Sequence, residues 1–125
     1  MKRCYSLKRN KEFRRTYRVG RSHGAKCMVL ISALRNKGEV KIGFSVGKKL
    51  GNAVVRNRVK RRMREAITPL IPQIKDGAKL IFIARQPIVE ESFINISQSM
   101  RYLLKKAELL CESAPQDAQG ERDTQ

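Results

Sequence analysis

The fold is decided by the stretch Gly51-Asn52-Ala53-Val54-Val55-Arg56-Asn57-Arg58-Val59-Lys60-Arg61-Arg62-Met63-Arg64-Glu65-Ala66-Ile67, whose apolar residues recur at helical spacing. At ~100° per residue, one narrow stripe of the helix carries Val55, Val59, Met63 and Ala66. A broad polar face carries Arg56, Lys60 and Arg64, and Arg58 and Arg62 lie on the opposite flank. So narrow a stripe predicts a helix that packs on a sheet. Pro69 and Pro72 end it.

The segments around this helix predict strands and two further helices. Lys26–Leu34 is almost continuously apolar and Val40–Val46 alternates, so each predicts a strand, and the turn between them predicts that they pair as a hairpin. After Asp76-Gly77, Lys79–Arg85 predicts a strand that is apolar on both faces. The resulting order of elements is helix, strands, helix, strand, helix, which is typical of an α/β fold.

Each end of the chain carries one of these additional helices. The first is expected to be capped by Asn10 and to end at Gly20 in the left-handed conformation that glycine tolerates. It places Phe13 and Tyr17 four residues apart, on one face. The last helix is expected to pack on the core through its regularly spaced apolar residues, Phe93, Ile96, Met100, Leu103, Leu104, Ala107 and Leu110.

The length of 125 residues allows one domain. We expect a single α/β domain over residues 1–111 and a disordered polar tail over residues 112–125, which is rich in Pro, Gln, Asp, Gly and Glu and has no apolar period. The sequence contains no run of about 18 apolar residues, so it predicts no transmembrane helix. The first residues also lack the apolar stretch of a secretory signal. A soluble, cytoplasmic protein is the expectation.

The charge is concentrated in the first half of the chain. Lys and Arg number 28 against 11 acidic residues, which gives a net charge of +17. Residues 1–64 hold 21 of these cations but only Glu12 and Glu39, whereas residues 65–125 hold seven cations and nine acids. Such concentration is typical of nucleic-acid binding, in which phosphates are neutralised and counterions are released. A membrane-surface helix is the less favoured alternative, because it needs a wider apolar face.

Eight cations lie between Lys48 and Arg64 with no acidic residue among them. A solvated charged face is the ordinary interpretation of such a run, but like charges four residues apart destabilise an isolated helix. We therefore infer that a polyanion outside the protein compensates them. Arg side chains can bind two phosphate oxygens at once, and Asn57 can bond to sugars or base edges.

The chain offers little chemistry for catalysis of its own. A nuclease that holds its own metal ions needs converging carboxylates, and the basic half has only two. Gly47-Lys48-Lys49-Leu50-Gly51 lacks P-loop spacing, although its lysines could hold a phosphate beside the next helix. Cys4, Cys27 and Cys111 lack metal-ligand spacing and predict reduced thiols, and His23 is expected in a turn. We predict no catalytic residue and no metal site.

The run Gly51–Arg61 resembles the Arg-Asn-Arg signature of the protein subunit of bacterial ribonuclease P. The resemblance extends from residue 7 to about residue 110. It includes Phe13 in the first helix, the strand exit Phe44–Lys49 and the apolar strand that ends at Ala84-Arg85 before Pro87. A run of eleven residues between strands of the right kind is far more specific than a basic helix alone.

The resemblance implies a two-layer α-β sandwich with a four-stranded sheet, so a short additional strand is expected near Arg21–Gly24. It also implies a left-handed βαβ crossover, against the general right-handed preference, in a fold like that of the second domain of a small-subunit ribosomal protein. In the family the RNA subunit is the catalyst and holds Mg²⁺. No cofactor bound by the protein itself is expected.

Residue roles follow from the same resemblance. The residues that would bind the catalytic RNA are Lys48, Lys49, Asn52, Arg56, Asn57, Arg58, Lys60, Arg61 and Arg64. Those that would bind the 5′ leader of precursor tRNA, in a cleft between the first helix and the sheet, are Phe13, Tyr17 and Ile31. This agrees with the stacking of unpaired nucleotides on aromatic rings beside a cationic rim, although an ordinary core pair is the alternative for Phe13 and Tyr17.

The expected function is therefore assistance to a catalytic RNA in the endonucleolytic removal of 5′ leaders from precursor tRNA, with no cleavage by the protein alone. One alternative is a ribosome-associated or general RNA-binding protein without a role in cleavage. A reader of the DNA major groove ranks last, because such proteins place a helix and a tight turn before the reading helix, whereas a strand precedes this one. Neither DNA nor a membrane is expected as a partner.

Overall fold

The computed structural model describes residues 10–34 and 38–111, with side chains from residue 13 onward. The predicted tail, residues 112–125, lies outside the described residues. One four-stranded sheet has the order β1-β2-β4-β3. Its strands are β1 (Arg21–Gly24), β2 (Met28–Leu34), β3 (Lys41–Ser45) and β4 (Ala78–Ala84). The helices are α1 (Asn10–Val19), α2 (Ala53–Ile67) and α3 (Phe93–Lys106).

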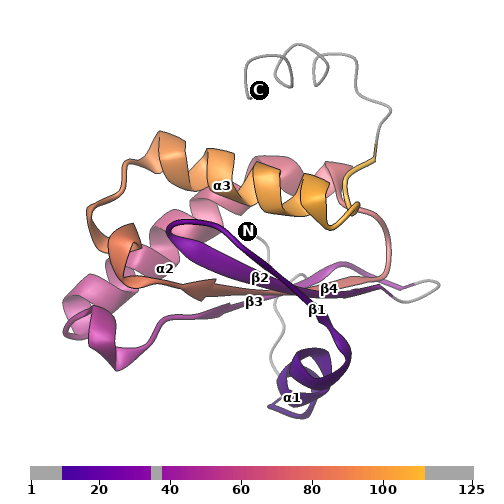
Figure 1. The fold of residues 1–125 in the computed structure, drawn as a ribbon, viewed down its shortest axis with the longest axis horizontal. Coiled ribbons are helices and arrows are strands. Elements are labelled where there is room, and N and C mark those ends of the chain that lie inside the picture. Colours follow the sequence, from indigo (N-terminus) through magenta and orange to yellow (C-terminus); the bar gives the residue numbers. More distant parts are fainter. Residues whose placement is uncertain (1–9, 35–37, 112–125) are drawn as a thin grey trace.

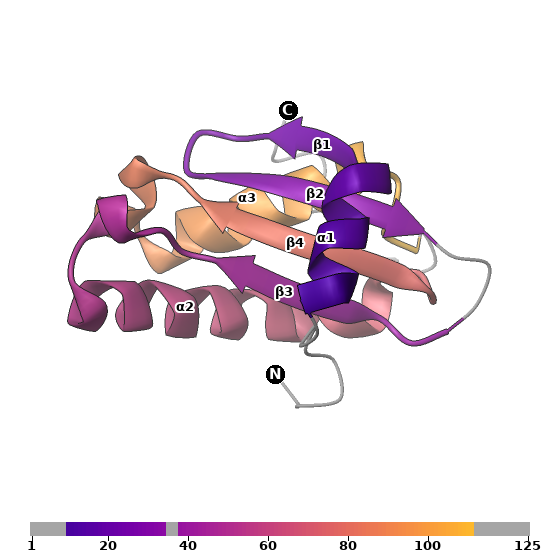
Figure 2. The same cartoon turned by 90° about the horizontal axis from the view of Figure 1, so that it is seen from below.

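The helices divide between the two faces of the sheet. Figures 1 and 2 show α2 and α3 side by side on one face and α1 crossing the other. Within the described residues, three short 3₁₀ helices join these elements: η2 (Lys48–Leu50), η3 (Thr68–Gln73) and η4 (Gln86–Glu90). The α/β sandwich is therefore confirmed. So is the additional strand at Arg21–Gly24, which places His23 in β1 opposite Leu30 rather than in the expected turn.

The predicted hairpin is wrong. Strands β2 and β3 do not pair with each other, because β4 lies between them, antiparallel to β2 and parallel to β3. The physical reason is the apolar character of β4 on both faces: Leu80, Ile81 and Phe82 have no exposed surface. A strand buried on both sides is most stable at the centre of a sheet, where helices cover both faces.

The connection from β3 through α2 to β4 joins parallel neighbours. In Figure 2, α1 is nearest the viewer and α2 lies beyond the sheet. When the molecule is turned so that α2 lies in front of the sheet and the parallel strands β3 and β4 point upward, β4 lies to the left of β3. The crossover is therefore left-handed, as the family resemblance implies and against the usual preference.

The main core lies between the sheet and the pair α2 and α3. Val59, Met63 and Ala66 of the predicted stripe are buried there, together with four apolar residues of α3: Ile96, Met100, Leu103 and Leu104. Helix α3 ends at Lys106, so the predicted apolar positions beyond it do not continue the helix. Leu110 instead forms an isolated β-bridge with Ile74.

Gly20 ends α1 for a reason that the sequence did not predict. Its φ is not positive, so the expected left-handed conformation is wrong. Its N–H donates to the carbonyl of Thr16 at 2.8 Å. A Cβ built at Gly20 would lie 2.8 Å from Cγ2 of Ile31 and 2.9 Å from the carbonyl oxygen of Ser32. Glycine is needed because the end of α1 lies directly against β2.

Candidate nucleic-acid interface

The chain leaves β3 and enters α2 through η2, which exposes Lys48 and Lys49. Gly51 follows with φ 147°, a conformation that favours glycine. The Oδ1 atom of Asn52 then accepts a hydrogen bond from the Val55 N–H at 3.1 Å and caps α2. Asn52 thus has a structural role in addition to its predicted contact with RNA.

Helix α2 carries the remaining predicted RNA-binding residues. Asn57, Arg58, Arg61 and Arg64 are exposed, and Arg56 and Lys60 are half-buried. None of the cations of η2 and α2 forms an ion pair with another residue in the part of the chain that the structure describes. Arg56 Nε donates only to the neutral carbonyl of Gly51, at 3.3 Å. The positive charge of this surface is therefore uncompensated within the described residues.

Arg62 is a residue that sequence reasoning left out of the site. Its Nη1 donates to the carbonyl of Glu91 at 3.2 Å, which ties α2 to the segment before α3. Together with Arg58 and Arg61, it lines a pocket against that segment. The helical spacing already placed Arg58 and Arg62 on one flank. The opposing wall, however, comes from η4, whose position only the tertiary structure reveals.

The predicted leader residues lie on the other face of the sheet. Phe13 is half-buried, and a Cβ built at Gly43 of β3 would overlap its ring, with Cε2 at 2.8 Å. Tyr17 is 43% exposed, whereas Thr16 is 3% exposed. Among the side chains of α1 that the structure describes, residues 13–19, the innermost is therefore Thr16, which sequence reasoning missed, and Tyr17 lies at the flank of the helix. If Phe13 and Tyr17 were an ordinary core pair, Tyr17 would be buried more completely than it is.

Ile31 lies on the same face of the sheet as the residues under α1. It pairs with Ile81, which pairs in turn with Gly43. These three residues form one row across β2, β4 and β3. Phe13 contacts the Gly43 end of the row, and Ile31 approaches Gly20 at the other end. The structure thus brings Phe13 and Ile31 to one surface, with Ile81 between them.

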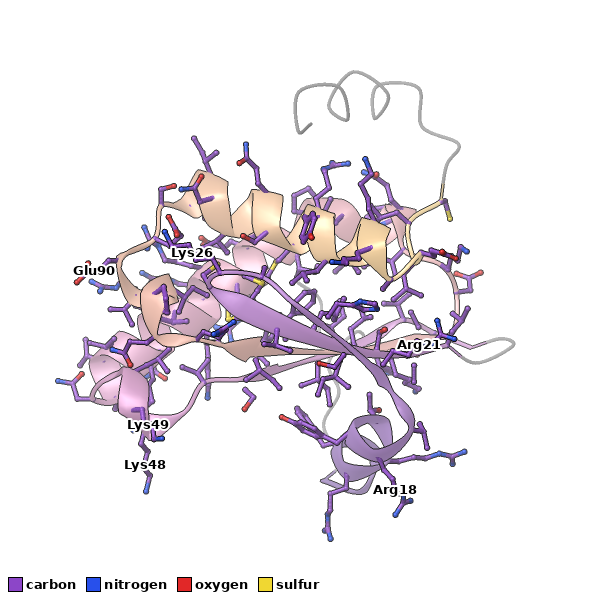
Figure 3. All side chains as sticks on the ribbon, in the orientation of Figure 1. Arg18, Arg21, Lys26, Lys48, Lys49 and Glu90 are labelled. Atoms are coloured by element: carbon purple, nitrogen blue, oxygen red, sulfur yellow. The ribbon has the colours of Figure 1, made fainter. Side chains whose placement is uncertain are left out.

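The cations gather at several edges of the molecule. Figure 3 shows Lys48 and Lys49 at one end, where the chain turns into α2, and Arg18 well apart from them, on α1. Arg14, Arg15 and Arg18 of α1 are all exposed. Basic side chains therefore border both the α2 surface and the α1 face. Such an arrangement can contact two segments of a phosphate backbone at once.

The other candidate groups do not form a reactive site. Burial raises the pKa of the Cys27 thiol, although its hydrogen bond to Ser99 Oγ, at 3.6 Å, opposes this shift. A thiol with a raised pKa is a poor nucleophile. Cys111 is exposed and Cys4 lies outside the described residues. In the described part of the chain, no group of three or more His, Cys, Asp or Glu residues could hold a metal ion, and no helix is long and apolar enough to cross a bilayer.

The sequence and the fold both match known proteins. The family model for ribonuclease P matches residues 1–108. The ribonuclease P protein component of Roseiflexus castenholzii is 41% identical over 108 residues, which cover 86% of this chain and 88% of that protein. The ribonuclease P protein component of Bacillus cereus is 36% identical over 108 residues, covering 86% and 94%.

Solved structures agree with these relatives. The ribonuclease P protein of Staphylococcus aureus superposes with a TM-score of 0.77 at 34% identity, over 85% of this chain and 97% of that one. The protein from Thermotoga maritima shares the fold at 24% identity, with a TM-score of 0.73 over 81% and 96% of the two chains. This chain belongs to the ribonuclease P protein family.

Proposed function

We propose that the chain is the RNA-binding protein subunit of a ribonuclease P, which assists a catalytic RNA in removing the 5′ leader from precursor tRNA. The observation that carries this proposal is the uncompensated charge of η2 and α2. Eight cations between residues 48 and 64 have no acidic residue among them and no ion-pair partner in the described structure. A polyanion such as a folded RNA would relieve their mutual repulsion and would release its own counterions on binding.

We assign a different RNA to each face of the sheet. The α2 surface, together with η2, binds the folded catalytic RNA through phosphate contacts. The α1 face holds the single-stranded leader, whose unstacked bases contact Phe13, Tyr17 and Ile31. The protein thereby screens the repulsion between two RNA molecules and fixes the leader beside the catalytic RNA.

Bond breaking belongs to the RNA in this proposal. Mg²⁺ ions held by the catalytic RNA would supply the activation of the attacking water, and no residue of the protein would hold them. The protein binds no cofactor and supplies no catalytic group. It acts in the cytoplasm on precursor tRNA and has neither DNA nor a membrane as a partner.

The test is reconstitution with precursor tRNA and Mg²⁺, with and without a bacterial catalytic RNA subunit. We expect accurate 5′ cleavage only with the RNA, and faster cleavage when the protein is present at low Mg²⁺. Cleavage by the protein alone would contradict the proposal. Binding of the catalytic RNA without any effect on cleavage would instead favour a ribosome-associated or general RNA-binding protein.

The cleavage assay without catalytic RNA should include one further substrate. A solved structure at 33% identity is a Staphylococcus aureus ribonuclease P protein mutant with defective mRNA degradation activity. A messenger RNA should therefore be incubated with the protein alone as well. Our proposal expects that it stays intact.

A further inference from the structure

An open pocket lies between α2 and the segment that joins β4 to α3. Its walls are formed by Arg58, Arg61, Arg62, Val89, Glu90, Glu91 and Ser92. Its volume of about 540 Å³ lies within the range of ~300–1,000 Å³ that is typical of sites for small ligands. Glu90 and the lysines of η2 lie at the same end of the molecule (Figure 3). The pocket therefore borders the proposed RNA-binding surface.

Some polar groups of this pocket already have partners within the protein. Arg62 donates to the carbonyl of Glu91 at 3.2 Å. The carboxylate of Glu91 accepts a hydrogen bond from Asn95 Nδ2 at 2.8 Å. Ser92 Oγ accepts from the Asn95 N–H at 3.1 Å and caps α3. These contacts fix the wall of the pocket.

The remaining charged groups have no such partners. Glu90, Arg58 and Arg61 are exposed, and none of them has a hydrogen bond or ion pair from its side chain among the described residues. They line one pocket without neutralising one another. The pocket thus offers strong donors and a strong acceptor to a ligand. A bare phosphate would satisfy only the arginines, and the Glu90 carboxylate would repel it.

A guanine base matches this combination of groups. Its O6 and N7 atoms are the acceptors that arginine binds most often in nucleic acids. Its N1–H and N2–H₂ groups are adjacent donors, which match the two oxygens of one carboxylate. Uracil has a single N–H donor on its pairing edge, and adenine and cytosine each have one amino group there. Guanine alone occupies both carboxylate oxygens.

We propose that this pocket binds one unpaired guanine of the RNA, whose N1–H and N2–H₂ groups donate to Glu90 while O6 and N7 accept from Arg58 and Arg61. The guanine is unpaired because Glu90 occupies its Watson–Crick edge. The inference rests on the proposed function for the source of the base, which is either the catalytic RNA or the precursor tRNA. It adds a base-reading contact to a surface otherwise described by phosphate contacts.

The sign of one charge change tests the proposal. Removing an acidic charge from a surface that faces RNA tightens binding if electrostatics alone matter. Glu65→Gln is the matched control, because Glu65 is exposed on α2 and lies outside the pocket. We expect Glu65→Gln to bind RNA slightly more tightly. Glu90→Gln should bind about tenfold more weakly, the size of one bidentate base contact.

Two RNA arms identify the source of the guanine. Weaker binding of Glu90→Gln to the catalytic RNA alone places the base in that RNA. Weaker binding that needs precursor tRNA places the base in the precursor. If Glu90→Gln tightens binding as Glu65→Gln does, or leaves both affinities unchanged, the proposal is overturned.

A titration without large RNA separates the pocket from the proposed function. The full chain is titrated with GMP, AMP, CMP, UMP and inorganic phosphate while the amide resonances of Glu90 to Ser92 are followed. We expect GMP to bind about tenfold more tightly than the other nucleotides, and Glu90→Gln to remove this preference. Equal binding of all four nucleotides, or the same resonance shifts with inorganic phosphate, would mean that the pocket binds an adventitious ion only and does not recognise the base. Either result would overturn the inference even if the cleavage assay with the catalytic RNA succeeds.

Discussion

Replacing Gly43 with alanine tests how α1 is seated on the sheet. A Cβ at this position would lie 2.8 Å from Cε2 of Phe13 and closer still to Cζ, whereas carbon atoms in contact are ~3.5–4.0 Å apart. The ring must therefore move by about 1 Å. Because Phe13 is only half-buried, the ring has room to move. We expect a loss of folding stability near the lower end of the ~1–3 kcal/mol range for overpacking.

The larger effect of Gly43→Ala should fall on leader binding. Stacking of a base on an aromatic ring contributes ~1–3 kcal/mol, so a displaced Phe13 should lose about 1 kcal/mol, or roughly fivefold in affinity. The assay is the ratio of the Kd values of the reconstituted holoenzyme for precursor and mature tRNA. Affinity for the catalytic RNA should not change, because α2 lies on the other face of the sheet.

The chain supplies a control and a second variant for this test. Gly24→Ala adds a methyl group to the same sheet at a position with no atom within 4 Å, and should change neither quantity. Phe13→Ala should raise the same ratio of precursor Kd to mature Kd, and adding Gly43→Ala to it should have no further effect, because both act through one ring. Additive effects of the two changes, or a folded Gly43→Ala protein with an unchanged ratio, would refute the reasoning.

Three predictions concern stability. Asn52→Ala removes the cap of α2 and should lower the free energy of unfolding by ~1 kcal/mol in urea; an unchanged midpoint would argue against the cap. Met63→Ala leaves a cavity at a fully buried site and should cost ~2–5 kcal/mol, whereas Val54→Ala, at a position 77% exposed, should cost little; equal losses would contradict the packing. The hydrogen bond from Asn95 lowers the pKa of Glu91. The contribution of this bond to folding stability is therefore present at neutral pH and is lost as the pH falls through the folded-state pKa of Glu91. Asn95→Ala should therefore lower the Tm at neutral pH, and the loss should shrink as the pH falls through the folded-state pKa and Glu91 becomes protonated in both states; a loss that does not change with pH would count against this bond.

Local patterns in the sequence predicted most of the elements. The apolar stripe through Val59 and Met63 follows from helical spacing, because the side chains of one face must be buried together. Asp76-Gly77 predicted the start of β4, and Gly77 has the positive φ of such a turn. These features depend on neighbours in the sequence, so a single chain is enough to reveal them.

Features that depend on distant contacts were not predicted from local patterns. A short turn favours a hairpin, but the burial of β4 on both faces outweighs that preference and separates β2 from β3. His23 has no strand pattern of its own and joins β1 only because β2 offers it a partner. Arg62 enters the candidate site because η4 folds against α2, which no spacing within α2 predicts.

Binding of the catalytic RNA should depend steeply on salt if the cations of η2 and α2 neutralise its phosphates. The decisive measurement is the slope of log K against log salt concentration for the unmodified protein, Lys48→Ala, Arg64→Ala and Lys75→Ala. Each of the first two changes should reduce the slope by ~0.7–0.9, the value of one phosphate contact. Lys75 is exposed beyond η3, so Lys75→Ala should leave the slope unchanged. A slope near zero, or equal reductions in all three variants, would contradict a phosphate-binding surface on η2 and α2.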